Sequence, residues 1–260
     1  MTPGFHNTSA TSYHSDCCSR PSLSASIAHR LLSASPYHAW LAHPKLGGVR
    51  REPTREMERG TIIHGIVLGQ PDELVVIQAA DYRTKAAQQQ RDDARANGMT
   101  PILASEYDGI VTAAYAIGDA LRAEGIELSG QSEAVAVWEE QTASGPILCR
   151  GMMDHVLQER ALIYDLKTCS SAHPKAIQRS IIDHGYDVQW AAYTSAFRKL
   201  RPDLAGREQF VWLFVEELPE GSPQRVALTV AKPSGLMREL GEWKWRRLRT
   251  LSTWSWACWA

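Results

Sequence analysis

The chain has 260 residues, with 28 Lys and Arg against 29 Asp and Glu, so its formal net charge is −1 at pH 7. This length suffices for one large or two small domains with a substantial core. The near-neutral balance excludes a protein that is basic overall, so any contact with nucleic acid must depend on local charge. Residues 20–59 carry seven Lys and Arg against three Glu, and residues 221–260 carry seven against two. This pattern suits a basic rim around an acidic centre, and it suits an ordinary solvated surface as well.

The cysteines and the apolar runs of the sequence indicate in which cellular compartment the protein is found. There are five cysteines, an odd number, and no two of them have the spacing of zinc ligands. The N-terminus has no continuous apolar core of a secretory signal, and no apolar run approaches membrane-spanning length. We therefore expect a cytoplasmic protein without a membrane partner.

The N-terminal half is expected to be mainly helical. Residues 1–21 are polar and aperiodic, which is typical of a disordered tail. Helices are expected over residues 22–32, 37–42, 54–68, 84–97 and 105–124, with a short strand at 74–77. One face of helix 54–68 carries residues at spacings of four, three and four, namely Met57, Thr61, His64 and Leu68. Gly60 inside this helix costs about 1 kcal/mol relative to Ala, which is tolerable where another segment approaches the backbone closely.

The C-terminal half changes to the period of two that is typical of strands. Strands are expected at 134–138, 147–157, 162–168, 210–215 and 225–230, and helices at 174–183, 187–200 and from about 234. Five tryptophans follow in or after this last helix, where we expect packing and a share of a protomer interface: Trp243, Trp245, Trp254, Trp256 and Trp259. The expected organisation is a single domain over 22–260, with a helical part (22–130), a strand-rich core (131–232) and a Trp-rich helix (233–260).

Two aspartates and a lysine in the expected strands point to metal chemistry. Side chains at i and i+2 of a strand share a face, so Asp165 and Lys167 point the same way and Leu166 points into apolar packing. If the two runs pair as a hairpin around residues 158–160, Asp154 reaches the same end of the sheet. Two carboxylates with an ammonium beside them suit Mg²⁺ and a proton-handling lysine, which is the chemistry of phosphodiester hydrolysis.

The triplet alone is weak evidence, because roughly one or two such triplets occur by chance in a chain of this length. Glu242-Trp243-Lys244 is a match of this kind in a helical context. The stretch Asp165-Leu166-Lys167 differs in having an apolar lead-in, Ala161 to Tyr164, and an aspartate on the preceding strand. The strand context of Asp165-Leu166-Lys167, rather than the residue types alone, therefore makes this triplet the candidate metal site.

Further polar residues have two interpretations each. His64 is either a satisfied core histidine or a metal ligand. Gln189 and Tyr193, at i and i+4, share a helix face for ordinary packing or for the site. Glu133 begins the first expected strand, either as a solvated acid or as a third carboxylate.

Five segments in this order resemble the PD-(D/E)xK nuclease superfamily, in the branch of the RecB nuclease domain and the phage recombination exonucleases. The segments are ERGTIIHGIVLG, DYRTKAA, GMMDH, IYDLKT and GYDVQWAAY. They span roughly residues 22–230, are specific together though not singly, and are most similar to the RecE (exonuclease VIII) type. The resemblance implies an α/β (α+β) fold with a restriction-endonuclease-like core. Its mixed central sheet would have about five strands, flanked by helices, after an N-terminal helical part.

The resemblance also implies a metal site. His64, Asp154 and Asp165 would hold Mg²⁺, for which Mn²⁺ substitutes, with the Leu166 carbonyl as a further ligand. A second ion would share Asp165 and Glu133. The four-cysteine set of iron–sulfur members is missing from the sequence, so no such cluster is expected.

The remaining implied roles concern water and DNA. Lys167 would orient or deprotonate the attacking water, and we expect burial to lower its pKa while the carboxylates hold it in check. Gln189 and Tyr193 would support the site and contact the DNA backbone. Arg83 and Lys85 would grip phosphates, although a solvated helix start is an equal interpretation.

The function that the resemblance implies is 5′→3′ exonucleolytic hydrolysis of linear double-stranded DNA in phage or prophage recombination. Such a protein would work in the cytoplasm of a bacterial or phage-infected cell as a ring-shaped homo-oligomer, with a single-strand annealing protein as partner. Two alternatives stay open. One is an end- or structure-specific endonuclease of the same superfamily, and the other is a non-cutting DNA-binding scaffold with a nuclease fold.

Overall fold

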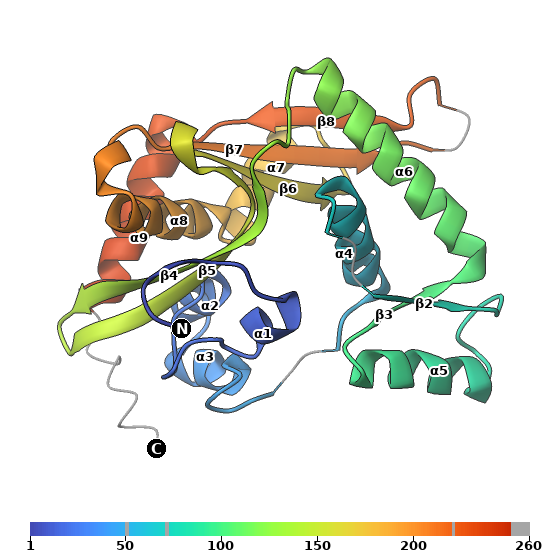
Figure 1. The fold of residues 1–260 in the computed structure, drawn as a ribbon, viewed down its shortest axis with the longest axis horizontal. Helices are drawn as coiled ribbons and strands as arrows, with labels where there is room; N and C mark the ends of the chain where they lie inside the picture. The colour runs from blue at the N-terminus through green and yellow to red at the C-terminus, as the bar shows by residue number, and fades with distance from the viewer. Residues whose placement is uncertain (50–51, 71–72, 220–221, 251–260) are drawn as a thin grey trace.

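The chain is described by a computed structural model that covers residues 1–49, 52–70, 73–219 and 222–250. Its centre is a six-stranded mixed sheet with the strand order β1-β4-β5-β6-β7-β8 (Figure 1). Neighbouring strands are antiparallel except β6 and β7, which are parallel. The strand bounds are β1 Gly4–His6, β4 Gln131–Thr142, β5 Gly145–Leu157, β6 Leu162–Cys169, β7 Gln209–Glu217 and β8 Val226–Ala231.

The remaining elements are mostly helical. The helices are α1 Ala10–His14, α2 Ala25–Ser33, α3 Pro36–Ala42, α4 Arg55–Val67, α5 Lys85–Ala96, α6 Ala104–Ala123, α7 Pro174–Asp183, α8 Tyr186–Leu200 and α9 Gly235–Thr250. Short 3-10 turns span Gln158–Arg160 and Pro202–Leu204. Helices α4 and α5 begin within one residue of the expected start and α2 three residues after it, because Thr54, Thr84 and Ser24 accept hydrogen bonds from the backbone of the first turn.

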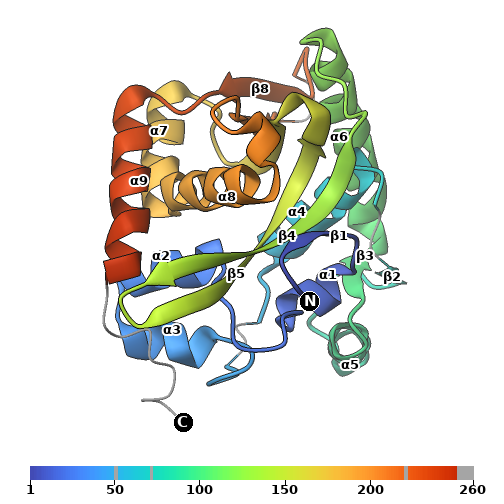
Figure 2. The same cartoon turned by 60° about the vertical axis from the view of Figure 1, so that its left-hand side comes forward.

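The sheet is covered on both faces, as β7 illustrates. Phe210, Trp212 and Phe214 point into the core formed with α2, α8 and α9. The intervening residues Val211, Leu213 and Val215 point into a second core formed with α4 and α6. Figures 1 and 2 show these two sets of helices on opposite sides of the strands. A continuous apolar strand is what a doubly covered sheet requires, and the strand expected at 210–215 is of this kind.

The predicted disordered tail over residues 1–21 is wrong. Strand β1 pairs with β4, and helix α1 follows it. Asp16 is fully buried and accepts hydrogen bonds from the backbone and hydroxyl of Ser22. Its carboxylate also lies 3.3 Å from Arg150 and 3.4 Å from His43. The polar N-terminal segment is ordered because the buried Asp16 carboxylate forms hydrogen bonds and ion pairs with residues from distant parts of the chain.

A second correction concerns residues 100–105. Thr100–Leu103 forms strand β3, which pairs in parallel with β2 (Leu74–Ile77) in a separate two-stranded sheet. The following helix α6 begins at Ala104, directly after Leu103 and without a side-chain cap, close to the start expected at residue 105. The described residues up to 130 therefore contain three strands among their helices, β1, β2 and β3.

The C-terminal helix α9 packs onto α8 and β4. Trp245 is buried beside Trp138, with ring centroids 6.3 Å apart, whereas Trp243 is half exposed. Lys244, the lysine of the chance triplet, is the partly buried counter-ion of the fully buried Asp187 on α8, at 2.7 Å. Trp254, Trp256 and Trp259 lie outside the described residues. Among the helices that are described, none is long and apolar enough to cross a membrane.

Candidate functional site

The hairpin of β5 and β6 brings the two aspartates together. The strands pair in antiparallel register as far as His155 opposite Tyr164, and Asp154 and Asp165 are the next residue of each strand beyond this pair. The turn between them is the 3-10 segment at 158–160, closed by Ala161 in the left-handed region (φ 49°). The backbone N–H of Leu166 donates to Oδ2 of Asp154 at 2.8 Å. Both carboxylates therefore stand at one place on the sheet, as the sequence predicts.

Helix α4 brings His64 to the same place. A Cβ on Gly60 would lie 3.2 Å from the Thr168 hydroxyl, so the glycine permits the close approach of α4 to β6. His64 Nδ1 lies 3.7 Å from Oδ2 of Asp154. Burial, with the nearby Lys167 charge, lowers the pKa of His64 to about 4, against a hydrogen bond to the Leu166 backbone that raises it. The ring is therefore neutral at pH 7, and a neutral imidazole is the form that binds metals.

Lys167 is the counter-ion of Asp165. Its Nζ lies 2.6 Å from Oδ2 of Asp165, whose side chain is completely buried. Burial alone would lower the pKa of Lys167, but the Asp165 and Asp154 carboxylates outweigh it and raise this pKa. Burial also raises the pKa of Asp165 to about 6. The predicted lowering of the Lys167 pKa is thus wrong for the protein as described, in which the lysine is a firm ammonium.

Helix α8 supports the strands from the other side of the site. Gln189 donates from Nε2 to Oδ1 of Asp165 at 2.9 Å. Its Oε1 is buried and accepts no hydrogen bond from the described residues. The Tyr193 hydroxyl donates to the Met152 carbonyl at 2.7 Å, and its ring lies so close to Gly151 that a Cβ there would stand 2.5 Å from it. Gln189 therefore holds a carboxylate, while Tyr193 holds the strand that carries the other.

A cleft of about 400 Å³ opens beside these residues, between α2 and the start of α8. The cleft is lined by Lys167, Gln189, Tyr186 and Arg150, among other residues. No Asp or Glu is among the described residues that line it. The cleft thus combines cationic, aromatic and amide groups of the kind that bind phosphate, and its two cations, Lys167 and Arg150, each pair with a buried acid behind the lining, Asp165 and Asp16.

Three predicted residues are not gathered in this way. Glu133 stands opposite Asp154 in the β4–β5 register, but its backbone leaves the strand conformation (φ 50°). Arg83 is ion-paired with Asp81 at the start of α5, and Lys85 is exposed in the first turn. Neither Arg83 nor Lys85 lines the cleft, and Figures 1 and 2 both show α5 far from β6 and α8.

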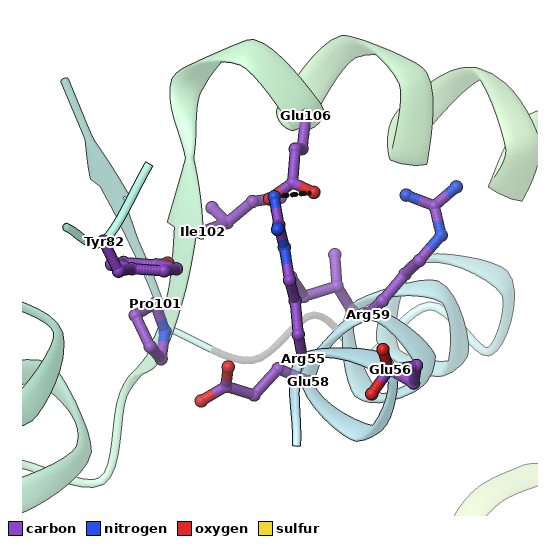
Figure 3. A pocket seen from close by; sticks show the side chains of 9 residues that line it. Arg55, Glu56, Glu58, Arg59, Tyr82, Pro101, Ile102 and Glu106 are labelled. Carbon is purple, nitrogen blue, oxygen red and sulfur yellow. Dashed lines mark hydrogen bonds and ion pairs between the residues drawn. The ribbon is translucent and has the colours of Figure 1, made fainter. Parts of the chain in front are cut away.

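The D-Y-R-T-K segment contributes to a different, smaller pocket of about 180 Å³ on the far side of α4 (Figure 3). Tyr82 points into it from that segment, and Arg55 crosses it to pair with Glu106 at 2.6 Å. Arg91 lies over the Tyr82 ring at 5.5 Å. The two arginines that line this pocket are already paired, Arg55 with Glu106 and Arg59 with Glu217. No residue of the Asp165 site lines it, so we assign the pocket to the packing of α4 against β3 and α6.

The donors at the site are of the type that Mg²⁺ prefers, namely two carboxylates with a neutral imidazole beside them. Oδ2 of Asp165 is buried and satisfies no hydrogen-bond geometry with the described residues, although Lys167 lies at ion-pair distance. The described residues contain no group of three or more His, Cys, Asp or Glu side chains arranged to hold a metal. The donor chemistry therefore fits a divalent ion, and Lys167 neutralises Asp165 in the arrangement described.

Sequence reasoning missed two residues of this site. Tyr186 lies three residues before Gln189 and therefore on nearly the same helix face, which is the signal that would have found it. Arg150 alternates with Met152 and Asp154 along β5, so its side chain points to the same face of the sheet.

One solved structure similar to this chain supports the fold. A protein from Eubacterium rectale named "putative exonuclease" aligns with a TM-score of 0.61 at 15% identity, covering 94% of this chain and 84% of its own. A "phage related exonuclease" from Haemophilus somnus aligns at 15% identity with a TM-score of only 0.35, over 88% of this chain and 92% of its own. No curated protein matches.

The family is shown by the sequence match. Residues 30–215, more than half of the chain, match the family described as "PDDEXK-like domain of unknown function (DUF3799)". The mixed sheet flanked by helices agrees with that fold. The chain therefore belongs to the PDDEXK-like DUF3799 family and has the fold of the PD-(D/E)xK nucleases.

Proposed function

We propose that this protein is a Mg²⁺-dependent exonuclease that hydrolyses phosphodiester bonds of linear double-stranded DNA. One observation carries the proposal: Asp154, Asp165 and Lys167 meet beside a cleft whose described lining is free of acid. Family membership and the fold support a nuclease, and the carboxylates with the adjacent ammonium support metal-assisted hydrolysis.

Asp154, Asp165 and His64 would hold the ion, with the Leu166 carbonyl as a further ligand and Glu133 at a second ion. A bound Mg²⁺ supplies a polarised phosphate and a more acidic water. Gln189 keeps Oδ1 of Asp165 oriented. Lys167, as an ammonium, donates to a phosphoryl oxygen and stabilises its developing charge, rather than acting as the base.

The cleft gives the DNA strand a place beside the carboxylates. Lys167 provides positive charge, and the exposed imidazole of His184 provides aromatic surface on which a base can stack. The finer parts of the proposal are 5′→3′ polarity, a ring-shaped homo-oligomer, a single-strand annealing partner, and a role in phage or prophage recombination in the cytoplasm. They follow from the resemblance to RecE-type exonucleases.

The deciding experiment incubates the protein with linear duplex labelled at the 5′ or the 3′ end, in Mg²⁺ and in EDTA. Wild type is expected to release nucleotides from linear DNA only with Mg²⁺, whereas Asp165→Ala and Lys167→Ala lose activity by about a hundredfold or more. Two exposed residues of the same types provide matched controls, Asp108→Ala and Lys232→Ala, and both should cut as wild type does.

The same assay separates the alternatives. Cleavage of covalently closed circular DNA would identify an endonuclease instead. DNA binding without cleavage in either Mg²⁺ or Mn²⁺ would identify a non-cutting scaffold. Equal activity of wild type and both site variants would show that the site is elsewhere.

A further inference from the structure

The turn between α7 and α8 holds an aromatic ring against Lys167. The ammonium of Lys167 lies 4.7 Å from the centroid of the Tyr186 ring. His184 stacks on the same ring, with centroids 5.5 Å apart and planes inclined by 19°. Phe214, the β7 neighbour of Lys167 in the sheet register, packs on Tyr186 at 6.2 Å. The Tyr186 ring that contacts Lys167 is therefore itself packed between His184 and Phe214.

The backbone fixes where this ring lies. Gly185 adopts a left-handed conformation (φ 71°), and a Cβ on it would stand 2.3 Å from the ring of His29 on α2. Only glycine fits there, since both the conformation and the space exclude a side chain. Tyr186 is the first residue of α8, directly after this glycine, so the contact between α2 and the turn determines the position of the ring.

The ring differs in kind from the other groups that face Lys167. The charged groups among them are the carboxylates of Asp165 and Asp154, and both are candidate metal ligands. A carboxylate that binds a cation gives up part of its attraction for the lysine. An aromatic face within about 6 Å attracts an ammonium through its quadrupole, and this attraction does not depend on whether the carboxylates are engaged.

We propose that Tyr186 is a positioning residue that holds the Lys167 ammonium on its ring face, so that the lysine keeps its place beside the scissile phosphate when the carboxylates are occupied. The inference rests on the proposed function for its catalytic part. The contact is made by the ring rather than the hydroxyl, so phenylalanine serves in place of tyrosine and an aliphatic residue does not.

The first test needs no metal. In protein labelled with ¹³C at the lysine ε carbon and kept in EDTA, the Lys167 resonance is assigned by its loss in Lys167→Arg. We expect ring-current shielding of this resonance in wild type and in Tyr186→Phe. In Tyr186→Leu the resonance remains, but its shielding is lost. Tyr115→Leu, which changes a tyrosine exposed on α6, is the matched control and should leave the resonance in place.

The second test uses the Mg²⁺-dependent assay on linear duplex. Tyr186→Leu should lower kcat by about tenfold, with a smaller change in KM, while Tyr186→Phe stays within about threefold of wild type. Tyr115→Leu should equal wild type. Tyr186→Met gives the same aliphatic replacement, with the same expectation, if the leucine variant does not fold.

Three results would overturn the inference while the proposed function stands: an unshielded Lys167 resonance in active wild type, an unchanged kcat in Tyr186→Leu, or an equal loss in Tyr186→Phe. The last result would assign the effect to the hydroxyl. Failure of wild type to cut any DNA would instead overturn the proposed function, and with it the catalytic part of the inference.

Discussion

Gln189 donates a hydrogen bond from its side-chain amide to Oδ1 of Asp165 across 2.9 Å, and thereby ties α8 to the centre of the site. Removing the amide leaves a buried carboxylate oxygen without its donor. Partners that orient a metal-binding carboxylate typically contribute about 10- to 100-fold to metal affinity or activity. We expect Gln189→Ala to raise the Mg²⁺ concentration for half-maximal cleavage by about that factor, measured in a metal titration. Unchanged Mg²⁺ dependence in a folded variant would contradict this role.

Glu140 should be essential for stability. Its carboxylate is buried and accepts hydrogen bonds from Ser195 (2.6 Å), Lys199 (2.9 Å) and the indoles of Trp138 and Trp245. Glu140→Ala leaves both buried indoles without this acceptor, while the half-exposed Lys199 keeps the Glu139 carbonyl, and we expect a loss of about 2–4 kcal/mol of unfolding free energy in denaturant titrations.

The neighbouring Glu139 provides the matched control for this experiment. Its side chain is 45% exposed and pairs only at the surface with Arg20, so Glu139→Ala should cost less than about 1 kcal/mol. Similar losses of unfolding free energy for the two variants would mean that the buried network around Glu140 stabilises the protein no more than a surface ion pair does.

Two glycines inside helices should respond differently to alanine. A Cβ on Gly109 of α6 meets nothing within 4 Å, so Gly109→Ala should stabilise the protein by about 0.5–1 kcal/mol through helix propensity. A Cβ on Gly60 lies 3.2 Å from the Thr168 hydroxyl and pushes α4 away from β6, so Gly60→Ala should lose this gain and lower the activity. Thermal melts and cleavage rates of the pair test the expectation, and equal stabilisation with full activity would refute it.

His64 should make the metal-free protein sensitive to acid. Its pKa is lowered from 6.5 to about 4 by burial, so the unfolded chain binds the proton more tightly than the folded one. The corresponding stability is complete above pH 6.5 and is lost as the pH falls towards 4, by up to about 3 kcal/mol.

Denaturant titrations in EDTA between pH 7 and pH 4 measure this loss, with His64→Gln as the comparison. Asp165, whose pKa is raised to about 6, gives the opposite dependence: its contribution is complete below pH 3.8 and is lost as the pH rises through 6. Both proteins contain Asp165, so the difference between them reports His64. Parallel curves for the two proteins would show that His64 does not contribute.

Local patterns in the sequence predict much of the site. The i, i+2 spacing of Asp165 and Lys167 needs only a strand, and the three-residue turn at 158–160 needs only the hairpin that brings Asp154 close to Asp165. His64 follows from the helical face it shares with Thr61. In each case the determining interactions are a few residues apart, or join strands that follow each other directly.

The rest depends on contacts between distant residues. Asp16 is ordered by Arg150 and His43, and no pattern within residues 1–21 contains these partners. The charge state of Lys167 depends on two carboxylates outweighing burial, a balance that spacing alone does not give. Arg83 was assigned by resemblance, whereas its nearest acid, Asp81, is two residues away and pairs with it.

The parallel pairing of β6 with β7 requires a crossover, and α7 and α8 supply it. Asp165, Lys167, Tyr186 and Gln189 all lie on the strand that enters this crossover or on the helix that returns from it. Most of the site is thus one continuous stretch of about sixty residues together with the preceding strand β5, and His64 is its contribution from elsewhere in the chain. Transplanting residues 145–217 into a related scaffold would carry the carboxylates, the lysine and their supports as a unit. The recipient would need to supply a histidine on a helix that approaches β6 as closely as Gly60 allows, and a helix that packs against Gly185 as α2 does.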